Sequence, residues 1–362
     1  MSTRAYVYSV YQWLNVKIFA IPGRVIALLF FAFLFIVPFI TANKYLIYTL
    51  SMTCIFAIFA TSWDFLSGYC GQINLGHGVF FAVGGYIASM LSAHFHLSPW
   101  LTISIGSLIA AIAGLIVTLP ALRLRGFYLS LVTLSFPIIS HGIVLAFADY
   151  TGGEVGLYGV SPLTTSGTTS YYIIVLIMLF SVFFMYKFTD LESKFIRVGI
   201  IIYAIREDEI TARASGINTT RYKFLVFFIS SFFAGIAGAL YAHTITVVGP
   251  STLEVMFSFQ PILWTIFGSI GTIYGPVAGV FLLYPFMEFL QIWGATEHIR
   301  YIIFALMLIC FMLFMPEGVT IWVRDKIEVT CQRCKKINIM TRSYCRICNG
   351  PLHLRKEESE DL

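Results

Sequence analysis

Long apolar blocks separated by short polar segments run along most of the chain. Each block approaches the length of about 20 residues that an α-helix needs to cross a bilayer. None alternates apolar and polar residues as the strands of a membrane barrel do. The pattern predicts an all-α polytopic membrane protein with about ten transmembrane helices, in a membrane domain of residues 25–320. The blocks cover residues 25–40, 46–66, 73–93, 99–119, 127–148, 171–188, 222–243, 256–273, 276–293 and 299–315.

The composition agrees with this pattern, because 58% of the residues are hydrophobic and only 11% are charged. A soluble domain carries about 25% charged residues. Residues 1–24 contain aromatic and basic residues but no clear small-residue cleavage site. We interpret them as a cytoplasmic lead-in and not as a signal peptide.

Lysine and arginine residues collect in segments that an even number of spans places on one side of the membrane. These segments are residues 4–24, 123–125, 187–223 and 324–326, whereas the opposite loops hold little more than Lys44 and Arg300. Cytoplasmic loops carry the excess of basic residues. We therefore expect a multi-pass plasma-membrane protein with both termini in the cytoplasm.

Charge concentrates in residues 204–223, "AIREDEITARASGINTTRYK". Ile210, Ala214 and Ile217 have the spacing of one helix face, and Tyr203 lies a heptad earlier, which predicts a short amphipathic helix. Glu209 and Arg213 can pair at i, i+4, and Gly216 suits a helix C-terminus. A helix lying on lipid favours a strongly basic face. Here acidic residues offset the basic ones, which favours a protein partner.

The C-terminal segment contains two CxxC motifs in "CQRCKKINIMTRSYCRIC". Two such motifs can supply four thiolates to one tetrahedral zinc ion. Two disulfides are the alternative, but the cytosol keeps thiols reduced. We expect a zinc ribbon in residues 325–352 with structural zinc, followed by a disordered tail, residues 353–362. The proposed ligands are Cys331, Cys334, Cys345 and Cys348.

The predicted spans contain few ionisable residues. Asp64 and Glu288 lie toward the ends of their blocks, without an evident opposite charge, and favour a packing role over a proton relay. The dipeptide Gly-Lys of a nucleotide-binding P-loop does not occur. The chain is therefore expected to lack an ATPase site. Transport against a gradient would need energy from another subunit.

Two glycine-rich segments in different halves of the chain, residues 67–86 and 268–279, hint at an internal duplication. Gln72, Asn74 and His77 lie in the first, where broken backbone at membrane depth is tolerated only in protein or beside a cavity. These side chains either line a substrate pathway or pack. Thr133 and Ser135 are further pathway candidates, the alternative being a kink at Pro137.

Several segments together resemble the LivM-type permease family of branched-chain amino acid ABC importers. The segments are "GYCGQINLGHGVFFAVGGY", "RLRGFYLSLVTLSF", "TGGEVGL", "AIREDEITARASGINTTRYK", "AGIAGALYA", "GSIGTIYGPVAG" and "MPEGV", which occur in the family's order between residues 45 and 320. As a set they are very specific.

The resemblance implies a transmembrane subunit that pairs with a second permease subunit. Two cytoplasmic ATPase subunits would bind the ATP, and an external solute-binding protein would deliver the amino acid. The chain itself would not be an enzyme, and no nucleic-acid partner is expected. The segment 199–221 would be the coupling loop that docks on the ATPase, through Arg206, Glu209, Ile210, Arg213, Ala214 and Gly216. The importer loop motif has Glu six residues before its Gly, where this chain has Ile210.

Three alternative functions remain open at this stage. A urea or short-amide permease of the same family would differ only in its solute. A secondary transporter or channel would need no ATPase, and the sparse charge in the spans argues against it. A membrane-anchored adaptor would use the zinc ribbon as its functional part. A membrane enzyme is least favoured, because no nucleophile–base pair or open metal site is evident.

Overall fold

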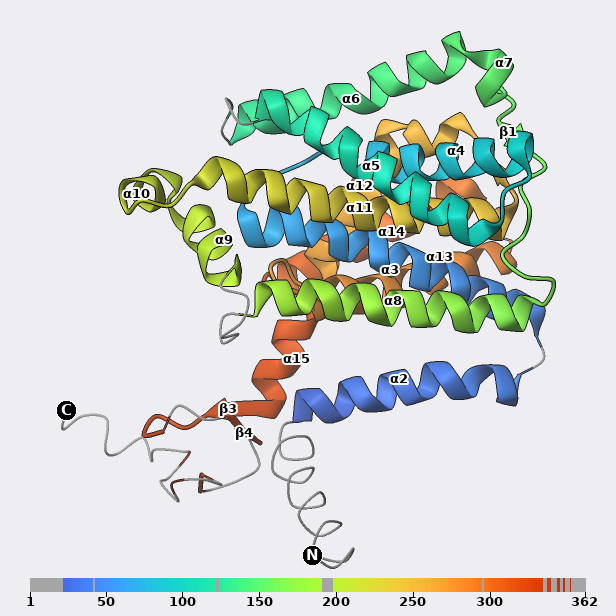
Figure 1. The fold of residues 1–362 in the computed structure, drawn as a ribbon. Coiled ribbons are helices and arrows are strands. Elements are labelled where there is room, and N and C mark those ends of the chain that lie inside the picture. The colour runs from blue at the N-terminus through green and yellow to red at the C-terminus, as the bar shows by residue number, and fades with distance from the viewer. Residues whose placement is uncertain are drawn as a thin grey trace, which may run out of the picture. The chain divides into compact units, whose positions relative to one another are not determined.

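A computed structural model of the chain describes residues 22–41, 43–121, 124, 126–190, 198–294, 296–334, 337–339, 344–345, 348 and 352. The chain forms two compact units, Asn43–Gly318 and the combination of Met1–Ala42 with Val319–Leu362. Most of the expected lead-in, residues 1–21, and the expected disordered tail, residues 353–362, lie outside the described residues. Figure 1 shows the fold.

The unit Asn43–Gly318 is built almost entirely from helices (Figure 1). Its only strands among the described residues are the antiparallel pair β1 (Leu157–Tyr158) and β2 (Val247–Val248). A short 3₁₀ helix, η2 (Pro250–Leu253), follows β2. The helices are α3 (Lys44–Cys70), α4 (Gly78–Phe95), α5 (Pro99–Ala121), α6 (Phe127–Ala146), α7 (Ala148–Thr151), α8 (Gly167–Thr189), α9 (Val198–Glu207), α10 (Glu209–Ala214), α11 (Thr219–Ile245), α12 (Val255–Gly268), α13 (Tyr274–Ile292) and α14 (Glu297–Phe314).

The second unit contributes two helices and a small hairpin among its described residues. The helices are α2 (Pro22–Ile40) and α15 (Val319–Ile327). The strands β3 (Glu328–Thr330) and β4 (Ile337–Ile339) pair antiparallel, with Val329 opposite Asn338.

The helices confirm the predicted all-α polytopic membrane fold. Eight stretches in the described residues are long and apolar enough to span a bilayer, and Leu28–Ile40 and Val255–Gly268 are shorter apolar helices. Each predicted block overlaps one of these ten. The predicted block 73–93 starts too early, because residues 71–77 are not helical and α4 begins at Gly78. The last spanning stretch, His298–Ile327, runs further than the predicted 299–315.

Helix α3 lies at the centre of this unit and packs against α8, α11, α12 and α13 (Figure 1). Small residues allow α11 to pack closely against α4 and α5. A Cβ atom at Gly238 of α11 would collide with the backbone carbonyl of Phe81 on α4, and one at Gly235 would lie 3.0 Å from the Cα of Ser107 on α5. These helices therefore pack with their backbones in close approach, which small residues at helix interfaces allow.

Helices α12 and α13 form a tight hairpin whose turn is Ser269–Ile273. Helix α12 ends at Gly268, and Gly271 in the turn has a φ of 74°. A Cβ at Gly268 would lie 3.2 Å from the backbone nitrogen of Gly279. The two backbones are therefore as close as glycine allows. The turn Ser269–Ile273 also contacts α3, because the Tyr69 hydroxyl accepts a hydrogen bond from the Ile273 N–H at 3.1 Å.

Candidate functional site

The charged segment folds into two short helices instead of one. The side chain of Asp208 accepts hydrogen bonds from the N–H groups of Ile210 at 2.8 Å and Thr211 at 3.2 Å. This N-cap separates α9, which ends at Glu207, from α10. The prediction of a single amphipathic helix that continues through Tyr203 is therefore wrong, because Asp208 satisfies the first N–H donors of a new helix.

Helix α10 ends at Ala214, two residues before Gly216, which was predicted to lie at the helix C-terminus. Gly216 has a φ of 82°, and its N–H donates to the carbonyl of Arg213 at 3.0 Å. The N–H of Ile217 donates to the carbonyl of Ala212 at 3.2 Å. These two bonds form a Schellman motif, in which glycine takes the left-handed conformation without a steric cost. The chain direction after α10 is thus fixed.

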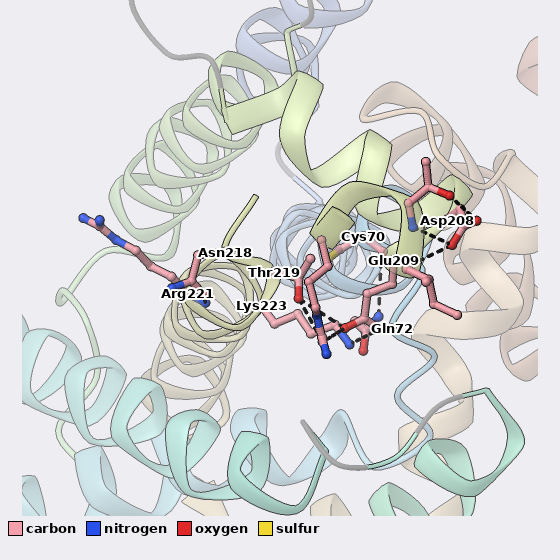
Figure 2. Close-up of polar contacts among 11 residues, drawn as sticks. Cys70, Gln72, Asp208, Glu209, Asn218, Thr219, Arg221 and Lys223 are labelled. Carbon is pink, nitrogen blue, oxygen red and sulfur yellow. Dashed lines mark hydrogen bonds and ion pairs between the residues drawn. The ribbon is translucent and has the colours of Figure 1, made fainter. Parts of the chain in front are cut away.

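Glu209 connects α10 to the first turn of α11. Its Oε1 accepts from Arg213 at 2.9 Å, which confirms the predicted i, i+4 pair, and its Oε2 accepts from Lys223 Nζ at 2.8 Å. The Thr219 hydroxyl also donates to Oε1, at 3.3 Å. The side chain of Lys223 is only 3% exposed and that of Glu209 13%. Figure 2 shows Thr219 and Lys223 directed toward Glu209.

An apolar stripe remains exposed on this segment. Ile210 is 64% and Tyr203 45% exposed, and Ala214 is also exposed. The residues that pack inward are instead Ile202, Ile205 and Ala212. Three residues of the predicted stripe are therefore exposed and Ile217 is half-buried, while a second set of apolar residues holds α9 and α10 in place.

Arg206, in the last turn of α9, lies against Gly71 after the end of α3 and Gly271 in the α12–α13 turn. A Cβ at Gly71 would lie 3.3 Å from the Cα of Arg206, and one at Gly271 would lie 2.9 Å from its Nη1. The fully buried Asp64 of α3 accepts a hydrogen bond from the Gly271 N–H at 2.8 Å and attracts Arg206 electrostatically. Arg206 therefore meets both α3 and the α12–α13 turn.

The nonhelical residues 71–77 follow directly after α3, and side chains satisfy much of their backbone. Trp63 Nε1 donates to the carbonyl of Asn74 at 2.7 Å, and Ser67 donates to the carbonyl of Gln72 at 3.0 Å. The Thr133 hydroxyl accepts from the N–H of Leu75 at 3.0 Å. Broken backbone inside a membrane protein requires such partners.

The predicted pathway residues in this segment lie inside the chain. Gln72 is 8%, Asn74 1% and His77 0% exposed. His77 Nε2 is 2.9 Å from the hydroxyl of Ser62, and the imidazole stacks on Phe59 with ring centroids 5.3 Å apart. These residues shape the break in the helix. Their part in a substrate pathway stays a prediction.

The two candidates on α6 differ in position. Thr133 is 1% exposed and its hydroxyl donates to the carbonyl of Ser130 at 2.9 Å. Ser135 is exposed, and its hydroxyl donates to the carbonyl of Val132 at 2.7 Å. Of the two, Thr133 is the one that hydrogen-bonds to the broken segment, through the N–H of Leu75. The structure therefore places Thr133 against the segment that holds Asn74 and His77, at Leu75 and Gly76, but leaves Ser135 exposed.

The four C-terminal cysteines converge beside the β3–β4 hairpin. Their sulfur atoms all lie within 4.8 Å of one another, and Cys331 and Cys345 are buried. A tetrahedral zinc site with Zn–S bonds of about 2.3 Å has sulfur–sulfur distances of about 3.8 Å. The Sγ atoms of Cys331 and Cys348 are 3.6 Å apart and those of Cys334 and Cys345 3.4 Å. None of these four cysteines forms a disulfide, so the group can hold a metal ion.

The environment of the cysteine group favours thiolates. Hydrogen bonds from the backbone N–H groups of Cys334 and Arg333 lower the pKa of the Cys331 thiol. Asn338 Nδ2 donates to Cys345 Sγ at 3.5 Å. Thiolate is the form of cysteine that binds metals.

Sequence reasoning missed two connections of the charged segment. Lys223 is 14 residues from Glu209, and Asp64 is 207 residues from Gly271. A lysine in the first turn of a long apolar helix was a usable signal, because a buried ammonium needs a partner. Asp64 had no such local signal.

The chain is similar to known transport proteins. Residues 45–312 match the family model described as "Branched-chain amino acid transport system / permease component". The high-affinity branched-chain amino acid transport system permease protein LivM of Salmonella typhimurium is 27% identical, over 79% of this chain and 72% of that protein. LivM of Escherichia coli is also 27% identical, over 77% and 71%. The permease protein LivH of Salmonella typhimurium is 25% identical, over 73% and 90%. No solved structure matches significantly.

Proposed function

This chain belongs to the permease-component family of branched-chain amino acid transport systems, and we propose that it carries branched-chain or similar small amino acids through a transporter driven by ATP hydrolysis in partner subunits. The proposal includes a second permease subunit, two cytoplasmic ATPases and an external solute-binding protein. Relatives named LivM and LivH, both matched by this chain, support a paired permease. The proposal places the protein in the plasma membrane with both termini in the cytoplasm.

The exposed stripe of Tyr203, Ile210 and Ala214 is the observation that carries this proposal. Isolated exposed apolar residues are ordinary, but here they lie beside the charge-rich helix α10, whose position is fixed at both ends. A surface of this kind suits a groove on another protein, in which apolar anchors are surrounded by charges. We assign that groove to the ATPase, so that segment 199–221 is the coupling loop.

Rigid attachment is what a coupling element requires. The ion pair of Glu209 with Lys223 ties α10 to α11, so a displacement of α10 moves the end of a membrane-spanning helix. Arg206 gives a second connection, to Gly71 after the end of α3 and to Gly271 in the α12–α13 turn. In this mechanism, movement of the ATPase shifts both connections together and re-orients the helices around the broken segment. Gln72, Asn74, His77, Thr133 and Ser135 remain the proposed pathway residues.

The function is tested by uptake of radiolabelled leucine. The chain, purified with the subunits it retains, is reconstituted in vesicles with the binding protein outside and ATP inside. We expect uptake that needs ATP hydrolysis and is reduced by isoleucine and valine, but not by urea or acetamide. Uptake without ATP would instead support a secondary transporter or channel. Competition by urea or acetamide would support the short-amide permease.

We also assign a structural zinc ion to the ribbon, with Cys331, Cys334, Cys345 and Cys348 as its ligands. Four thiolates at these separations suit tetrahedral zinc and leave no open position for catalysis. A unit this small lacks a sufficient hydrophobic core, so metal binding would supply much of its folding free energy. The ribbon would occupy residues 325–352, next to the cytoplasmic face.

Metal analysis of the purified chain tests the zinc assignment. We expect about one zinc ion per chain, lost in Cys345→Ser, because three thiolates bind zinc more weakly than four. Binding should weaken at low pH, where protons compete for the thiolates. Cys310→Ser, which removes an exposed cysteine of α14, should keep the metal. A metal-free wild-type chain, or full zinc content in Cys345→Ser, would contradict the assignment. Unchanged leucine uptake in Cys345→Ser would argue against the adaptor function.

A further inference from the structure

Glu288 of α13 lies beside the beginning of α3, at the end of the bundle opposite Asp64. The Tyr45 hydroxyl donates a hydrogen bond to Glu288 Oε2 at 2.5 Å. Tyr284 lies four residues before Glu288 on α13, and Tyr48 lies three residues after Tyr45 on α3, so each shares a helix face with one member of this pair. Three tyrosines from two helices therefore surround one carboxylate.

This carboxylate lacks a cationic partner in the part of the chain that the structure describes. The ion pairs found there involve Glu209 and Asp325 but not Glu288. A carboxylate among membrane-spanning helices is costly, and such residues usually face a cavity or a partner. The tyrosine hydroxyls offer hydrogen bonds but no positive charge. The arrangement is thus electrostatically incomplete.

Two of the tyrosines are exposed on the surface of the chain, and the third packs on aromatic rings. Tyr45 is 41% and Tyr48 39% exposed, and Glu288 is half-buried. Beneath them, the ring of Tyr284 lies 5.0 Å from that of Phe56, and the ring of Tyr241 lies 6.1 Å from it. Aromatic faces attract ammonium groups and also accept aliphatic chains. A small molecule with one ammonium and one aliphatic end fits both properties.

We propose that Glu288, together with Tyr45, Tyr48 and Tyr284, forms a binding site for the ammonium end of a small aliphatic amino acid. This inference rests on the proposed function, because it makes the site a step in substrate transfer. With α3 beginning on the outer side, the site lies where a delivered amino acid enters. The carboxylate and the Tyr45 hydroxyl contact the ammonium group, and the rings of Tyr241 and Tyr284 accept the aliphatic side chain.

Two analogues of leucine separate its charged groups. 3-Methylbutylamine keeps the ammonium and the side chain, whereas 4-methylpentanoate keeps the carboxylate and the side chain. Each is added to the purified full-length complex, and the thermal midpoint is measured. We expect the amine to raise the midpoint in the wild type and the carboxylate to leave it unchanged.

Glu288→Gln removes the charge and keeps the shape, so it should abolish the shift caused by the amine. Glu254→Gln is the matched control, because Glu254 is an exposed carboxylate at the start of α12 whose side chain caps no helix. In vesicles, Glu288→Gln should raise the KM for leucine by at least about tenfold, as expected for losing a hydrogen bond to a charged group. Tyr45→Phe should have a smaller effect in the same direction.

The thermal measurement decides the site independently of transport. No shift with the amine in the wild type, or the same shift in Glu288→Gln, would overturn the inference and leave Glu288 a packing residue. An amine shift that Glu288→Gln removes supports the site even if the wild type takes up no leucine. In that case the proposed function fails and the binding site stands.

Discussion

Glu209→Gln should strongly destabilise the segment that connects α10 to α11. The substitution keeps the side-chain shape but removes the charge opposite Lys223, whose side chain is 3% exposed. Breaking one half of a buried ion pair typically costs about 3–5 kcal/mol, because the remaining charge stays buried without a partner. We therefore expect a large fall in the thermal midpoint and folded yield of the detergent-purified chain.

Two further variants determine whether the pair causes this effect. Glu207→Gln removes the same charge two residues away, at an exposed position, and should change stability by less than about 0.5 kcal/mol. The double variant Glu209→Gln with Lys223→Met removes both charges and should recover most of the lost stability. If Glu209→Gln behaves like Glu207→Gln, the ion pair does not hold the segment.

The architecture was largely predictable because membrane-spanning helices are local features of the sequence. Each requires its own run of apolar residues, so ten blocks gave ten apolar helices. Gly216 and the pair of Glu209 with Arg213 were predictable for the same reason, since both depend on residues within one turn or two. The cysteine group also follows from spacing within the chain.

Helix boundaries, and contacts between residues far apart in the sequence, were harder to predict from the sequence. Asp208 is a good N-cap residue, and the competing helical periodicity of Tyr203 and Ile210 concealed that signal. The start of α4 depends on Trp63, Ser67 and Thr133, whose side chains satisfy a nonhelical backbone that is otherwise apolar enough to look like a span. Such contacts arise only from tertiary packing.

Ile210→Glu should remove the ATPase from the complex while leaving this chain folded. Ile210 is 64% exposed, so a glutamate there remains in water in the isolated chain and costs little stability. In the proposed complex the same carboxylate would be buried in an apolar groove without a partner, where an unpaired polar group loses its hydration. The measurement is the amount of ATPase that co-purifies with the tagged chain.

Co-purification in mild detergent, with the retained proteins identified by mass spectrometry, is the most direct test that this segment docks on an ATPase. The matched control is Val155→Glu, which adds the same charge at an apolar residue that is 71% exposed and lies outside segment 199–221, between α7 and β1. We predict that the wild type and Val155→Glu retain an ATPase and that Ile210→Glu does not, at equal thermal midpoints. An ATPase retained equally by all three chains, or absent from the folded wild type, would contradict the account.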